Sequence, residues 1–209
     1  MSDARWSTRT SAAVALALAM GLFAGCAGDL RRDRGGGVAG GGDRVESTDG
    51  GDGSIHTRID ATKSDLWVYL DLETNAEVFP AVPGTSTAWD LGFQRFKIIT
   101  NGGISGAGGM EVAALPGASF DEMTHAPPSG YVVDQPDSAD EDSDPDYAFL
   151  ANGAWYTYNL STHTVQVRDI VYVVKTVESG FFKLQLTAYY DDAGTGGHPA
   201  FRWAPVQAP

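Results

Sequence analysis

The chain has 209 residues, of which 43% are hydrophobic and 20% charged, and its formal net charge at pH 7 is −13. This excess of carboxylates argues against nucleic acid and bare anionic lipid as partners, because both are polyanions. A single cysteine excludes an internal disulfide, so the fold must be held together by its core. The length suits one domain after an export segment and a linker.

Residues 1–25 have the pattern of a bacterial lipoprotein signal peptide. Arg5 and Arg9 supply a positive amino-terminal region, and the apolar run that follows is too short to cross a bilayer as a helix. The run ends at Cys26, and a lone cysteine after small residues is typical of a lipobox; an ordinary signal peptide with an incidental cysteine is the alternative. Since Ala27 rather than an aspartate follows, we expect lipid anchoring at Cys26 in the outer membrane.

Residues 26–58 are rich in glycine and aspartate and contain little that is apolar. Such a composition cannot bury enough surface to offset the entropy of ordering, so a flexible tether is predicted. The pattern then changes, and a single β domain is expected over residues 59–209.

Alternating apolar side chains predict the first strands of this domain. The segment 66–72 places its apolar residues on one face. The next strand is expected over 89–100, where the apolar phase shifts near Gln94 or Arg95 and indicates a bulge or a sharp bend. A glycine-rich tract over 102–109 follows, which is either a bulged or disordered hairpin loop or a loop that lines a ligand cleft.

Further strands are expected over 110–115, 154–160 and 164–167. The clearest hairpin joins 169–177 to 181–190 across a Glu-Ser-Gly turn. Short strands separated by glycine and proline, with hardly any helical periodicity, predict an all-β fold. We expect two packed antiparallel sheets.

Residues 127–146 form a long acidic loop that begins at a Pro-Pro pair and contains no basic residue. A loop of this length in a compact domain is usually functional or disordered. Within it, Asp140, Asp142, Asp144 and Asp146 alternate as oxygen ligands of the type that Ca²⁺ prefers, although the glycine and the later glutamate of an EF-hand loop are missing. A calcium site is therefore the alternative to a solvated acidic loop.

The sequence carries no enzyme motif. Acidic residues are plentiful, but no pattern pairs them as acid and base, and no nucleophile elbow, phosphate loop or HExxH sequence occurs. We therefore expect a protein that is not an enzyme.

Several segments are distinctive as a set. They are STAWDLGFQRFKIITNGGISGAGG at 86–109, AWYTYNLSTHTVQV at 154–167, DIVYVVKTVESGFFKLQLTAYYDDAGT at 169–195 and PAFRW at 199–203. Together they resemble the HmuY family of bacterial lipoproteins and secreted proteins that capture haem. The resemblance implies an HmuY-like β domain, axial ligation of haem by His or Met from loops at one end of the sheets, and transfer to an outer-membrane haem receptor.

Haem requires axial ligands for the iron, an apolar slot for the macrocycle and cations near the propionates. His163 lies in a turn within one of the resembling segments and is the first candidate ligand. Met123 or His125 is expected to approach the iron from the opposite side, and His198 ranks lower. The candidates for the cleft and the propionates are Arg95, Lys97, Arg168 and Trp155, each of which has a structural alternative as a core or surface residue.

Two functions remain open at this point. The first is haem capture through axial His or Met coordination, serving uptake across the outer membrane. The second is an acidic surface lipoprotein that binds a glycan or a protein without haem, with calcium as a conceivable cofactor.

Overall fold

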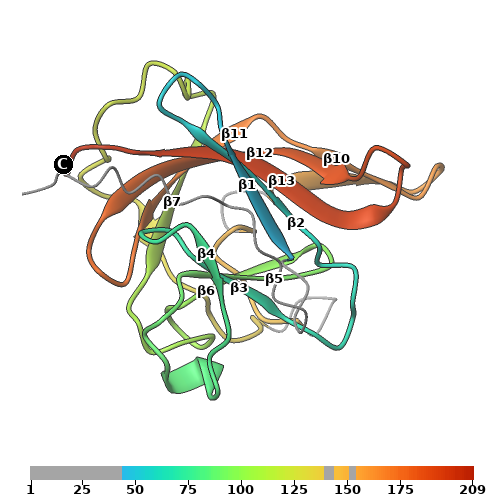
Figure 1. Cartoon of the computed structure of the whole chain (residues 1–209), viewed down its shortest axis with the longest axis horizontal. Helices are drawn as coiled ribbons and strands as arrows, with labels where there is room; N and C mark the ends of the chain where they lie inside the picture. The colour runs from blue at the N-terminus through green and yellow to red at the C-terminus, as the bar shows by residue number, and fades with distance from the viewer. Residues whose placement is uncertain (1–43, 139–143, 151–153) are drawn as a thin grey trace, which may run out of the picture. The chain divides into compact units, whose positions relative to one another are not determined.

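The computed structural model describes residues 44–138, 144–150 and 154–209, so the predicted signal peptide at 1–25 and the lipidation site Cys26 lie outside the described residues. The regular secondary structure of the described residues is almost entirely β-strand (Figure 1), which confirms the predicted fold class. No helix among them is long and apolar enough to cross a membrane. The elements are β1 (Val45–Asp49), β2 (Ile55–Ile59), β3 (Val68–Asp71), β4 (Ala76–Val78), the 3₁₀ turn η1 (Pro83–Thr85), β5 (Leu91–Gln94), β6 (Lys97–Thr100), β7 (Glu111–Pro116), β8 (Tyr131–Val132), β9 (Tyr156–Asn159), β10 (Thr164–Val167), β11 (Ile170–Lys175), β12 (Phe181–Tyr190) and β13 (Gly196–Pro205).

The larger sheet has seven antiparallel strands in the order β1-β2-β13-β12-β11-β7-β8. Its centre is the predicted hairpin of β11, which is rich in β-branched residues, and β12, in which apolar and polar residues alternate over the middle of the strand. The side chains of Tyr172, Leu184 and Trp203 share one face of neighbouring strands and are buried. This face forms one wall of the core.

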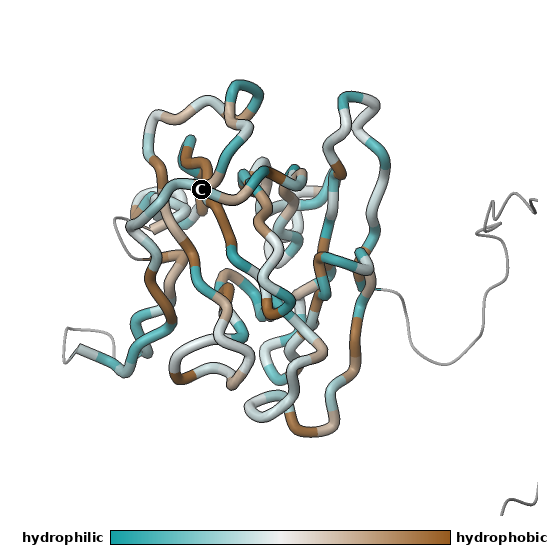
Figure 2. The backbone as a smooth tube through the Cα atoms, turned by 90° about the vertical axis from the view of Figure 1, so that its left-hand side faces the viewer, coloured by the Kyte–Doolittle hydropathy of each residue, from teal (hydrophilic) through white to brown (hydrophobic). Residues whose placement is uncertain are grey.

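A four-stranded sheet in the order β4-β3-β5-β6 forms the opposite wall. Figure 2 shows hydrophobic stretches along the strands of both layers. Phe93 of β5 stacks on Phe201 of β13 with ring centroids 5.6 Å apart and planes inclined by 10°. Val68 and Leu70 of β3 belong to the same core cluster. The prediction of two packed antiparallel sheets is therefore confirmed, and β9 with β10 adds a separate two-stranded hairpin.

The predicted tether ends too late in the sequence, because its last residues form strands. β1 and β2 lie within the expected range 26–58, yet they form one edge of the large sheet. Thr57 is buried, and its hydroxyl accepts a hydrogen bond from the indole Nε1 of Trp203 at 2.9 Å. The polar composition of this segment suggests a tether, but a polar side chain such as Thr57 can be buried when a partner distant in sequence completes its hydrogen bond. Residues 26–43 of the expected tether lie outside the described residues.

The strand expected over 89–100 is a tight hairpin instead. β5 ends at Gln94, β6 begins at Lys97, and the two residues pair with each other. Arg95 between them has φ of 56°, the left-handed conformation needed to reverse the chain so abruptly. The phase shift in the apolar pattern thus marked a reversal of direction.

The glycine-rich tract after β6 packs closely around a buried asparagine. The Nδ2 atom of Asn101 donates to the carbonyl oxygens of Ser86 and Trp89 at 2.8 and 2.7 Å, and its Oδ1 atom accepts from the N–H of Gly108 at 2.9 Å. A Cβ atom at Gly106 would lie 2.1 Å from Asn101 Oδ1. The glycines therefore permit close packing, so a disordered loop was the wrong interpretation of this tract.

The acidic loop expected at 127–146 is anchored by Asp134. This side chain is buried and accepts hydrogen bonds from the N–H groups of Thr100 and Ala148, each at 2.8 Å. Burial raises its pKa above the ordinary value of an aspartate, while these bonds oppose the shift. Asp134 thereby fixes the loop against β6, so a large part of the loop is an ordered component of the fold.

Candidate functional site

The β9–β10 hairpin lies beside the carboxyl-terminal end of β12. The ring of Trp155, just before β9, is 5.9 Å from that of Tyr189. The N–H of Val165 donates to Tyr190 Oη at 2.8 Å. The β5–β6 turn reaches the same place, because Trp155 Nε1 donates to the carbonyl oxygen of Phe96 at 3.2 Å. We call this region, where the hairpin and the two turns β5–β6 and β12–β13 adjoin, the hairpin end (Figure 1, right).

One face of the hairpin is apolar from its base to its tip. Tyr156 and Tyr158 pair with valines of β10, and the base of the hairpin packs against the core. Toward the tip the support of the core ends: Tyr158 is 48% exposed and Leu160 is 79% exposed. Phe96, which is also exposed, contacts Tyr156 edge to face at 6.0 Å. Exposed apolar groups gathered in this way mark a surface suited to contact with a ligand or partner.

His163 lies in the turn of this hairpin. Its φ of 54° is unusual for a residue other than glycine and directs the chain back into β10. The Nδ1 atom of His163 is 3.0 Å from Tyr158 Oη, and the two ring centroids are 6.2 Å apart. A hydrogen bond at Nδ1 fixes the orientation of the imidazole and leaves Nε2 as the atom available to a metal.

The three cations expected near the propionates also lie at the hairpin end. Arg95 Nη1 and Arg168 Nη1 each donate to a backbone carbonyl oxygen, at 3.3 and 3.1 Å. Lys97 Nζ forms an ion pair with Asp144 Oδ1 at 2.8 Å, and both side chains are partly exposed. The two guanidinium groups retain further N–H donors beyond these single bonds.

Trp155 is a core residue that lines only a small cleft. It is 1% exposed and packs on Tyr156 and Tyr189. The cleft between it, β6 and the segment 144–150 has a volume of about 40 Å³. Sites for small organic ligands usually enclose about 300–1,000 Å³, so a macrocycle would have to lie across the hairpin surface.

Met123 and His125 lie at the opposite end of β12. Lys183, near the start of β12, donates from Nζ to the carbonyl oxygen of Met123 at 3.0 Å. From Lys183 to Tyr190 the strand extends for seven residues, or about 23 Å at the usual rise. Two axial bonds to one iron span only about 4 Å. The structure therefore does not bring Met123 or His125 to His163, and the expected pairing is wrong.

The path of the β7–β8 connection explains this separation. Phe120 packs against Val171 and Ala204 on the outer face of the large sheet. The side chains of Lys183 and Arg202 lie over its ring, 4.5 and 4.2 Å from the centroid. These contacts carry the connection across the sheet, away from the hairpin end.

Two further side chains of the ligand type, His198 and Met110, are held by other contacts. His198 lies near the start of β13, close to the hairpin end, but its Nε2 atom is 3.6 Å from Asp191 Oδ2. Met110 is fully buried in the core. His163, by contrast, has an exposed imidazole on an apolar hairpin surface.

Of the four expected calcium ligands, only Asp144 and Asp146 lie among the described residues. Asp140 and Asp142 lie outside them. Asp144 is paired with Lys97, and Asp146 exchanges two backbone hydrogen bonds with Gln135. The calcium site remains a prediction.

Solved structures share this arrangement of packed antiparallel sheets. A Bacteroides vulgatus protein described as HmuY-like and heme binding is 20% identical, with a TM-score of 0.54 over 76% of this chain and 95% of that one. The apo HmuY analog of Tannerella forsythia gives the same values. A Bacteroides fragilis protein described as a lipoprotein is 19% identical, with a TM-score of 0.52 over 75% and 93%. At these identities the likeness shows the fold.

The chain belongs to the HmuY family, because the family model "HmuY protein" matches residues 63–203, well over half of its length. This confirms the resemblance seen in the sequence. No curated protein matches the chain.

Proposed function

We propose that this protein is a non-enzymatic haem-binding protein in which His163 supplies an axial ligand at the hairpin end. Family membership supports this function, as does the similar fold of a protein described as heme binding. The observation that carries the proposal is the exposed imidazole of His163 on an apolar hairpin, held through Nδ1 by Tyr158.

The residues of the hairpin end suit the three parts of haem, which are the iron, the apolar macrocycle and the propionates. The Nε2 atom of His163 provides a nitrogen ligand, and Tyr158 orients the ring. Leu160 and Phe96 add exposed apolar contact area. Arg95 is a suitable partner for a propionate, because its guanidinium has more N–H donors than its bond to the carbonyl oxygen of Thr62 uses. When bound, haem supplies the iron and a flat apolar surface; no bond in the macrocycle needs to be made or broken.

The geometry also predicts the coordination number. Among residues 44–209, Met123 and His125 are remote from His163, Met110 is buried and His198 faces Asp191, while His56 lies on β2 and pairs with Arg202 of β13. His163 therefore provides the single protein ligand, and we expect a five-coordinate, high-spin ferric haem. This differs from the pair of protein ligands that we expected from the sequence.

The place of the protein in the cell is a further part of the proposal. The predicted lipobox at Cys26 and the fold shared with a protein described as a lipoprotein support attachment to a membrane by lipid. An outer-membrane location and delivery of haem to an outer-membrane receptor for uptake complete the role.

A hemin titration of the purified protein tests the function. We expect a shifted, sharpened Soret band that saturates at one haem per chain, with high-spin features in the ferric spectrum. A spectrum identical to free hemin at micromolar protein contradicts the proposal. Were calcium then to raise the melting temperature, the acidic glycan- or protein-binding alternative would be favoured.

A further inference from the structure

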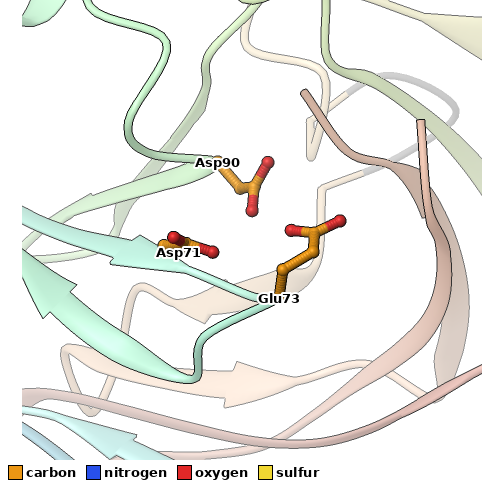
Figure 3. A group of neighbouring side chains, drawn as sticks. All are labelled: Asp71, Glu73 and Asp90. Atoms are coloured by element: carbon orange, nitrogen blue, oxygen red, sulfur yellow. The ribbon is translucent and has the colours of Figure 1, made fainter. Parts of the chain in front are cut away.

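A group of carboxyl side chains lies far from the hairpin end, where the small sheet meets the β11–β12 turn. Asp71 ends β3, Glu73 lies in the turn that follows, and Asp90 immediately precedes β5 (Figure 3). One carboxylate oxygen from each lies within 4.8 Å of the others. Asp90 is 1% exposed, whereas Glu73 is open to solvent. The group therefore joins a buried acid to an accessible one.

Asp90 connects the two sheets through its two carboxyl oxygens. Oδ2 accepts a hydrogen bond from the N–H of Leu72, at the end of β3, at 2.9 Å. Oδ1 accepts one from the N–H of Val177, in the β11–β12 turn of the large sheet, at 3.0 Å. Glu73 reinforces the same junction, because its carboxylate accepts a hydrogen bond from the Thr176 hydroxyl. These bonds hold the turn between β11 and β12 against the small sheet.

Among the described residues, the charged groups that face this junction are acidic. Asp71 and Glu73 approach from β3 and its turn, and Glu178 approaches from the β11–β12 turn. Burial is the main cause that raises the pKa of Asp90, to about 7, and Glu73 adds to the shift while the two backbone hydrogen bonds oppose it. Burial and the neighbouring carboxylates also raise the pKa of Glu178. One proton in this group relieves the repulsion between adjacent carboxylates.

We propose that Asp90 carries a proton that it donates to the carboxylate of Glu73, and that this proton holds the β11–β12 turn against the small sheet as a latch. While Asp90 is protonated, it donates to Glu73 and keeps both of its backbone partners. When the proton leaves, two anions face each other across the junction, and the turn loosens. The latch acts at the end of the molecule opposite to His163 and does not depend on the proposed haem site.

The sign of the effect on stability follows from linkage. The folded state binds this proton more tightly than the unfolded chain, in which the pKa of Asp90 returns to its ordinary value of 3.8. The stabilising contribution is therefore complete below about pH 4 and is lost as the pH rises toward 7. Unfolding midpoints should fall across this window.

The test compares unfolding midpoints in denaturant at pH 5 and pH 8 for the wild type, Glu73→Gln and Glu122→Gln. Glutamine at position 73 donates to Asp90 without titrating, so we expect the fall between the two pH values to shrink. Glu122→Gln removes an exposed carboxylate from the β7–β8 connection and should keep the wild-type fall. An undiminished fall in Glu73→Gln overturns the latch.

A second measurement on the unmodified protein guards against a variant that fails to fold. We expect ¹³C NMR of the Asp90 carboxyl to show a titration midpoint well above 4, and a midpoint near 4 overturns the proposal. If Ca²⁺ stabilises the wild type at pH 8 but does not stabilise Glu73→Gln, the junction binds a cation. That result would also overturn the proposal.

Discussion

The Nδ1 atom of His163 lies 3.0 Å from the Oη atom of Tyr158, across the turn that joins β9 to β10. This contact occurs where the hairpin has left the core, so packing alone does not hold the imidazole in place. A hydrogen bond to the ring nitrogen that faces away from a metal orients a histidine ligand and increases its basicity. We therefore expect Tyr158 to position His163 in the proposed haem site.

Tyr158→Phe should weaken haem binding without abolishing it. Loss of such an outer hydrogen bond usually costs about 10–100-fold in affinity, and we expect about tenfold at this exposed site. Hemin titration followed at the Soret band measures the change. Tyr131→Phe is the matched control, since the Tyr131 hydroxyl is buried without a partner among the described residues and lies on β8. Equal affinities of the two variants would remove Tyr158 from the site.

The hydroxyl of Thr57 should contribute to the stability of the whole domain. Thr57→Val leaves the Nε1 donor of Trp203 buried without its acceptor, which costs about 1–3 kcal/mol in the free energy of unfolding. Urea denaturation measures this cost. Thr48→Val on the exposed side of β1 makes the same chemical change and should stay within about 0.5 kcal/mol of the wild type. Equal free energies of unfolding for Thr57→Val and Thr48→Val would indicate that β2 contributes little to the core.

Gly103 should tolerate no side chain. A Cβ atom there would lie 1.9 Å from the carbonyl oxygen of Asp134, and φ is +59°, so Gly103→Ala should cost more than about 3 kcal/mol. Gly117 also has positive φ, at +78°, but a Cβ atom there meets nothing within 4 Å. Gly117→Ala should cost only about 1–2 kcal/mol, the backbone penalty. Thermal unfolding of both variants separates the two effects, and equal losses would contradict the packing described for the glycine tract.

Local patterns predicted much of the fold. The alternation of apolar and polar residues in β12 is strong because one face of this strand lines the core over most of its length. The chain reverses direction at Arg95, where the apolar pattern of the sequence shows only a shift of phase. A turn of two residues contains too few residues to be recognised as a turn from the sequence. The composition places Thr57 in the predicted tether. The sequence contains no local sign of its burial, because its hydrogen-bond partner Trp203 is remote along the chain.

The candidate site was predicted only in part. His163 and the cations Arg95 and Arg168 are indeed close to one hairpin, because each follows or ends a short strand there. Met123 is remote because Phe120 docks on the outer face of the large sheet, and no local pattern records that contact. The Tyr158–His163 contact had a detectable signal, since Tyr158 lies near the end of one predicted strand and His163 lies in the turn that follows it.

The most direct test of the account compares hemin titrations of the wild type, His163→Ala and His125→Ala. Both variants remove one exposed imidazole, but the two histidines lie at opposite ends of β12. We predict that His163→Ala loses the shifted Soret band while His125→Ala keeps it, with unchanged unfolding midpoints for both proteins. A wild-type spectrum in His163→Ala, or loss of the band in His125→Ala, would contradict the assignment of the haem ligand to the β9–β10 hairpin.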